Sequence, residues 1–87
     1  MKSRYLTHSG LTESLSKVPL IEMAGQNRVL IENHLGVLAY SLEEIQIKAA
    51  YGVIVVRGEQ LRLLQLSAEQ LVITGLIREV RLLGRQI

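Results

Sequence analysis

Two similar stretches, GVLAYSLEEIQIK (residues 36–48) and GVIVVRGEQLRLL (residues 52–64), follow each other at a spacing of 16 residues. Each begins with a glycine, continues as an apolar run, breaks at polar residues and ends in a second strand-like segment. In the first copy Ile45 and Ile47 alternate with polar residues, which is typical of a strand that buries one face. The repeat therefore predicts paired β-strands, and it contains no constellation that identifies a chemical reaction.

Strand signals of the same kind extend outward from this repeat to both sides. The core must be built from Leu, Ile and Val, because the chain has no Phe or Trp, and β-branched Ile and Val favour strands. Glycines interrupt every candidate helix. The expected strands are Pro19–Met23, Arg28–Glu32, Val37–Tyr40, Glu44–Ala49, Val53–Arg57, Gln60–Leu66, Gln70–Thr74 and Arg78–Leu83.

These strands and their short connections predict an all-β fold. The arrangement that we expect is an antiparallel β-meander of about eight short strands, curled into a small sandwich. The 16-residue repeat leaves an alternative, a two-sheet β-solenoid in which the third, fifth and seventh strands stack in parallel. The meander is favoured because Tyr51-Gly52 and Gly58-Glu59 resemble the turns of short antiparallel hairpins.

Two details of the pattern concern the turns and the sixth strand. Glycine adopts left-handed backbone angles readily, so we expect Gly36, Gly52 and Gly58 to lie in or beside hairpin turns. Within Gln60–Leu66 the apolar side chains change sides between Leu63 and Leu64. A β-bulge at that point would direct the later leucines toward the same core as the earlier ones.

The chain of 87 residues predicts one small domain. We expect a polar leader at residues 1–17, flexible or forming a short helix, a single all-β domain at residues 18–84, and a tail at residues 85–87. No apolar run reaches the roughly 18 residues that span a bilayer, and the N-terminus lacks the apolar core of a signal peptide. The sequence therefore predicts a soluble, cytoplasmic chain.

The charges argue against nucleic acid as the main partner. Ten Lys and Arg residues oppose eight acidic ones, giving a net charge of +2, and the two signs are interleaved. Five arginines between residues 57 and 85 could form a stripe, but that stretch lacks the aromatic residues on which bases stack. We therefore expect these arginines to be scattered over a solvent-exposed face.

The segment Glu32-Asn33-His34-Leu-Gly36 is the most distinctive cluster in the chain. A metal site would need further ligands, but the only other histidine is His8 in the leader, and the chain has no Asp or Cys. The segment therefore predicts a turn with His34 facing solvent. Because no nucleophile has a plausible base and acid partner, we expect no enzymatic activity, no cofactor and no small-molecule substrate.

Two expected strands are apolar on both faces. In a sheet with one solvent-exposed face, Leu38, Tyr40, Ile54 and Val56 would form an exposed patch, and such patches usually mark interfaces. These four residues are our candidates for an interface. They predict a homo-oligomer whose contact includes the third or fifth strand, or a sheet edge.

The order and spacing of these elements resemble a known family over about Val18 to Leu83. The matching segments are Pro19-Leu-Ile-Glu-Met-Ala-Gly25, Val29-Leu-Ile-Glu-Asn-His-x-Gly36, Val37 to Tyr40, Ile45-x-Ile47, Gly52-x-Ile54, Gly58-x-x-Leu61-x-Leu63 and Gly75-x-Ile77-x-x-Val80. The sequence resembles the YabP/YqfC family of sporulation proteins, and the Glu-Asn-His-x-Gly segment resembles the YqfC branch.

The resemblance implies a role but no catalytic site. It implies a structural or assembly protein of endospore formation that acts in the cytoplasm of the sporulating cell through its β-sheet surfaces and edges. The alternative that it implies is an adaptor that docks on YqfD, a membrane-anchored sporulation protein, and so lies at the periphery of a membrane.

Overall fold

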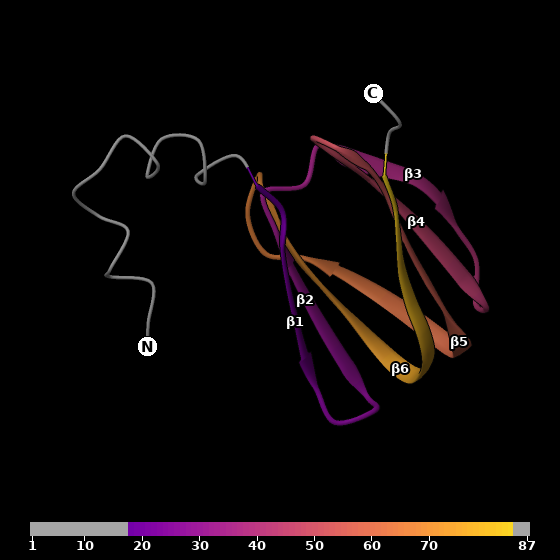
Figure 1. The fold of residues 1–87 in the computed structure, drawn as a ribbon. Coiled ribbons are helices and arrows are strands. Elements are labelled where there is room, and N and C mark those ends of the chain that lie inside the picture. The colour runs from indigo at the N-terminus through magenta and orange to yellow at the C-terminus, as the bar shows by residue number, and fades with distance from the viewer. Residues whose placement is uncertain (1–17, 85–87) are drawn as a thin grey trace.

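The computed structural model describes residues 18–84, and the expected leader and tail lie outside the described residues (Figure 1). The described part of the chain forms one open sheet in which all neighbouring strands are antiparallel. The six strands are β1 (Leu20–Ala24), β2 (Arg28–Glu32), β3 (Gly36–Tyr40), β4 (Glu44–Ala49), β5 (Gly52–Gln65) and β6 (Gln70–Gly84). The predicted all-β antiparallel class is confirmed, and the solenoid alternative, which needs parallel strands, is wrong.

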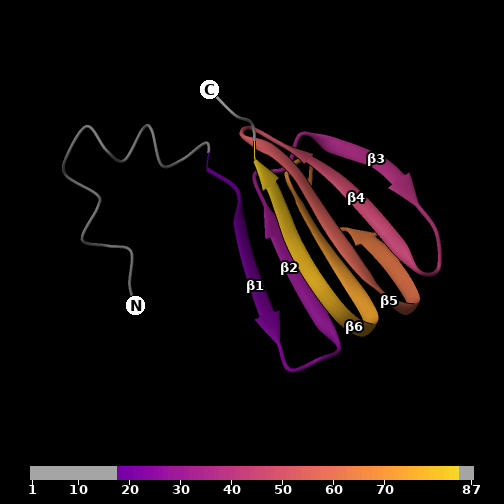
Figure 2. The ribbon, with the colours of Figure 1, turned by 45° about the vertical axis from the view of Figure 1, so that its right-hand side comes forward.

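The strand order is β1-β2-β6-β5-β4-β3, with the two long strands at the centre. Because β5 and β6 are long and bent, they take part in both halves of the sheet, which face each other (Figures 1 and 2). The β1–β2 half consists of β1, β2, residues 70–74 of β6 and residues 62–65 of β5. The β3–β4 half consists of β3, β4, residues 52–57 of β5 and residues 79–84 of β6.

Four of the expected strands, between residues 53 and 83, form only two strands, because β5 and β6 each continue through the bend. We predicted a hairpin at Gly58-Glu59, but β5 continues through these residues, and its pairing with β6 shifts register on both sides of them. Gly58 is needed for close approach rather than for a turn, since a Cβ there would collide with the backbone carbonyl oxygen of Leu76. A bulge and a hairpin both favour glycine, so the local sequence does not distinguish them.

The predicted bulge at Leu63–Leu64 is also wrong. Residues 62–65 pair with residues 71–74 without a shift, so side chains alternate regularly along this part of β5. Leu63 packs against the core, whereas Leu64 and Leu66 lie exposed on the opposite side.

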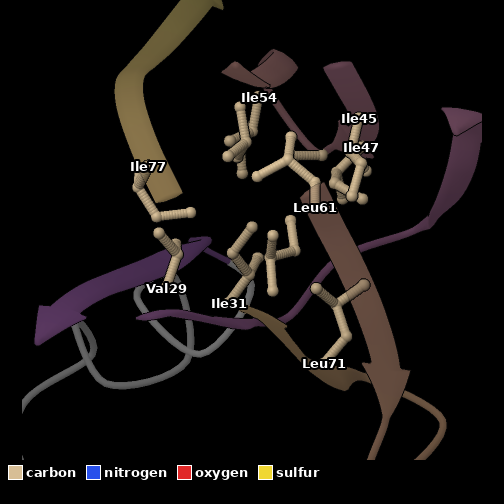
Figure 3. Close-up of a cluster of buried hydrophobic side chains, with 11 residues drawn as sticks. Val29, Ile31, Ile45, Ile47, Ile54, Leu61, Leu71 and Ile77 are labelled. Carbon is tan, nitrogen blue, oxygen red and sulfur yellow. The ribbon is translucent and has the colours of Figure 1, made fainter. Parts of the chain in front are cut away.

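One hydrophobic core lies between the two halves, with side chains from both halves pointing toward one another (Figure 3). It therefore joins strands that are far apart in the sheet order. Ile54 and Val56 belong to this core and are fully buried within the chain itself, so the expectation that they form an intermolecular contact is wrong. The buried cluster consists of Val29, Ile31, Ile45, Ile47, Ala49, Ile54, Val56, Leu61, Leu71, Ile73 and Ile77.

Candidate functional site

The Glu32-Asn33-His34 segment forms a corner that ties three parts of the chain together. Asn33 has a left-handed backbone angle, φ 66°, which asparagine adopts more readily than most residues. Its backbone N–H donates to the carbonyl oxygen of Glu69 over 2.7 Å, and its side-chain Nδ2 donates to the carbonyl oxygen of Val18 over 2.9 Å. The corner therefore joins the end of β2 to the β5–β6 loop and to the residues before β1.

His34 is buried with 6% of its surface exposed, so the prediction of a solvent-facing histidine is wrong. Its Nε2 lies 2.9 Å from Nε2 of Gln65, and that amide nitrogen also donates to the carbonyl oxygen of Ser67 over 2.6 Å. The contact with Ser67 fixes the amide orientation, so the imidazole Nε2 accepts and the proton lies on Nδ1. Among residues 18–84, Nδ1 has no hydrogen-bond partner.

The remaining polar groups of the corner are used within the fold. Gln70 Nε2 donates to Glu32 Oε2 over 2.8 Å, next to a polar hollow that Ser67 and Glu69 also line. Among the described residues, no three His, Cys, Asp or Glu side chains gather closely enough to hold a metal ion. The geometry supports a structural joint. Of the other glycines expected in or beside turns, Gly52 begins β5 directly after the β4–β5 turn, whereas Gly58 lies within β5.

The outer face of the β3–β4 half carries a network of paired charges. Arg57 Nε lies 2.8 Å from Glu44 Oε1, and the Arg57 Nη1 lies 3.5 Å from Glu79, which also binds Arg81 over 2.7 Å. Hydrogen bonds from Gln46 and then from Arg57 lower the pKa of Glu44 below its ordinary value, and the hydrogen bond from Arg81 lowers that of Glu79. These charges satisfy one another and favour a solvated face.

The outer face of the β1–β2 half is apolar at its centre. Cross-strand pairing places Leu30 beside Val72 and Val72 beside Leu64, so these three side chains form a row across β2, β6 and β5. Val72 is buried with 6% exposed, although it points away from the core, and Leu64 is 61% exposed. A hollow at the edge of this face is lined by Leu20, Ile21, Glu22, Leu30 and Glu32, so two carboxylates border it. We call this surface the apolar outer face.

The other two interface candidates lie on the edge strand β3. Leu38 and Tyr40 are each 54% exposed, and the β3–β4 register shifts beside Leu38. The Tyr40 hydroxyl accepts a hydrogen bond of 3.2 Å from the backbone N–H of Leu63, which connects β3 to the edge of β5 in the other half. Both side chains are therefore accessible, and Tyr40 has a structural contact as well.

Sequence reasoning missed the apolar outer face, although two signals pointed to it. Val29-Leu30-Ile31 is apolar on both sides of its strand, and the change of sides after Leu63 is regular alternation rather than a bulge. We directed Leu64 to the core by placing a bulge between Leu63 and Leu64.

The family comparison agrees with the resemblance in the sequence at the level of the family. A model of the YabP family matches residues 16–86. No curated protein and no solved structure matches the chain. In the part of the chain that the structure describes, no helix is long and apolar enough to cross a membrane.

Proposed function

The chain belongs to the YabP family, and on this premise we propose that it is a sporulation protein of the YqfC type. We propose that it acts without catalysis, as a structural or assembly component in the cytoplasm of the sporulating cell. It acts through its sheet surfaces and edges, and it forms a homo-oligomer through them.

The observation that carries this proposal is the amount of apolar surface left outside the core. A small domain gains stability by burying large side chains, at roughly 1.5 to 3 kcal/mol each. Yet Leu20, Leu38 and Leu64 are all more than half exposed. Exposed apolar surface on this scale supports a function in protein–protein contact.

The sheet edges offer a second kind of contact. Strand β1 is exposed along its whole length, and neither β1 nor β3 contains Lys or Arg, the residues that usually discourage strand addition at an edge. An edge of this kind can accept a strand from another protein. This favours, as the second candidate function, an adaptor that docks on the membrane-anchored YqfD.

Deletion of the gene in an endospore-forming host tests the biological role. We expect a marked loss of heat-resistant spores, which the wild-type chain restores when supplied from a second locus. Wild-type spore counts in the deletion strain would contradict the proposal.

Membrane fractionation of sporulating cells separates the two candidate functions. A chain that enters the membrane fraction only when YqfD is present would indicate the adaptor, and a distribution that does not depend on YqfD would favour the assembly component. Met23→Lys on the exposed edge strand β1 should abolish recruitment by YqfD if the adaptor docks at that edge. The matched control is Leu83→Lys, because Leu83 is about equally exposed but lies on β6.

A further inference from the structure

The apolar outer face has a charge pattern as well as an apolar centre. The row Leu30–Val72–Leu64 runs across the middle of the face, at right angles to the strands. On one side of it Arg28 and Arg62 both pair with Thr74, which places two cations in the neighbouring row. On the other side Glu32 pairs with Gln70. On β1 the central row ends at the exposed carboxylate of Glu22, which pairs with Leu30. The face is therefore basic at one end, apolar in the middle across β2, β6 and β5, and acidic at the other end and at its β1 edge.

These charges differ from those of the β3–β4 half, because they have no ion-pair partner within residues 18–84. Within residues 18–84 neither Arg28 nor Arg62 forms an ion pair, and Glu32 is bound only to the neutral amide of Gln70. Arg57 and Arg81, by contrast, each have a carboxylate partner on their own face. The apolar outer face thus leaves both of its charged ends available to a second molecule.

We propose that the apolar outer face binds the same face of a second copy of this chain, related by a two-fold axis that runs across the strands. Rotation about this axis reverses the strand direction and leaves the strand order in place. The central row then packs on its own copy, and Arg28 lies opposite the partner subunit's Glu32, twice by symmetry. This inference rests on the proposed function, since it names the surface through which the chain self-associates.

Self-complementarity favours a second copy over an unrelated partner. In an isologous two-fold contact, residue i of one subunit meets residue j of the partner, and j meets i. With this axis Glu22 at the β1 edge lies opposite its own copy, whereas the oppositely charged Arg28 and Glu32 meet each other twice. Arg28 and Glu32 lie on the same strand, β2, on opposite sides of Leu30, and this is the arrangement that such an axis brings together. The ion pairs contribute mainly to specificity, because exposed pairs add little affinity.

The size of the face predicts a weak dimer. Four strands about 4.8 Å apart and five residues at about 3.4 Å each give roughly 300 Å² of projected surface on each subunit. The two subunits together contribute roughly 600 Å², which is below the roughly 1,000 Å² of a stable specific interface. We therefore expect a weak, transient dimer with a dissociation constant of about 10–100 µM.

Sedimentation velocity from about 1 to 300 µM tests the role of the apolar row. We expect the wild-type chain to pass from monomer to dimer over this range, and Leu64→Thr to weaken the dimer at least tenfold. The control is Leu83→Thr, an exposed leucine on the other half, which should leave the dimer unchanged. Equal effects of the two substitutions, or a wild-type chain that is monomeric throughout, would overturn the proposal.

Charge reversal tests the two-fold geometry without relying on an apolar substitution. Arg28→Glu alone and Glu32→Arg alone should each be monomeric, because like charges then meet across the axis. Mixing the two variants should restore a heterodimer, since both pairs become opposite in sign. Failure of the mixture to associate, with both single variants folded by circular dichroism, would overturn this geometry. If both single variants still dimerise, the apolar outer face is not the dimer interface. That result would leave self-association possible, and the spore counts would still test the proposed function separately.

Discussion

The two halves of the sheet share one core but differ on their outer faces. The outer face of the β3–β4 half carries Glu44, Arg57, Glu79 and Arg81, whose charges pair with one another. The apolar side chains Val53, Val55 and Leu83 lie beside this network. The β1–β2 half instead presents an apolar row flanked by Arg28 and Arg62 on one side and Glu32 on the other, and these three residues form no ion pair within residues 18–84. The fold needs only the inner face of the sheet to be apolar. The apolar row on the outer face of the β1–β2 half is therefore not required for folding and is available for contact with another molecule.

The largest effect on stability is expected from a substitution that disturbs the bend shared by the two halves. In Gly58→Val the added Cβ meets the carbonyl oxygen of Leu76, which is backbone and cannot move aside. We expect a loss of about 4 kcal/mol or more in the free energy of unfolding, close to the whole stability of so small a domain. Urea unfolding followed by circular dichroism measures it.

The control for this substitution is Gly25→Val. Gly25 has φ +59° but no heavy atom within 4 Å of an added Cβ, so the cost should be only about 1–2 kcal/mol of backbone strain. Similar losses for Gly58→Val and Gly25→Val would show that close approach at the bend is not the cause.

Matched core substitutions in the two halves test whether the halves unfold together as one cooperative unit. Ile31 on β2 and Ile47 on β4 are both fully buried in the shared core. Replacing either by Ala should cost about 3 kcal/mol, with a single unfolding transition in both variants. Two transitions in either variant would mean that the halves unfold separately.

A smaller effect is expected at the corner that fastens the β1–β2 half. Asn33→Ala loses the hydrogen bond to Val18 and places alanine at a left-handed backbone angle, for a cost of about 2 kcal/mol. Asn33→Gly loses only the hydrogen bond, so it should cost about 1 kcal/mol. Equal melting temperatures for the Ala and Gly variants would contradict the backbone argument.

The smallest effect is confined to the outer face of the β3–β4 half. The folded state lowers the pKa of Glu44 and Glu79, so their contribution to stability is present at neutral pH and is lost as the pH falls through their lowered pKa values. We expect the double variant Glu44→Gln with Glu79→Gln to lose less of its melting temperature between pH 7 and pH 3 than the wild type does. Added salt should reduce the difference between them. An identical pH dependence of the two proteins would contradict a role for these charges.

The sequence by itself determined the strand character of the chain and the inward faces of β2 and β4. Ile45 and Ile47 alternate with polar residues, and Val29 and Ile31 lie two positions apart on one side of β2. The period of two is a local property of the strand. Asn33 and Gly36 also marked the end of one strand and the start of the next, because their residue types tolerate the backbone angles required there.

Contacts between distant parts of the chain determine how these strands are joined and which side chains remain exposed. Gly58 is compatible with a hairpin or with a bend, and only its contact with Leu76 on β6 selects the bend. The same pairing with β6 keeps Leu64 in regular alternation, which directs it outward. His34 is buried, and its ring contacts Gln65, which lies 31 positions further along the chain. Each of these outcomes depends on a strand or loop distant in sequence, whose position no local pattern contains.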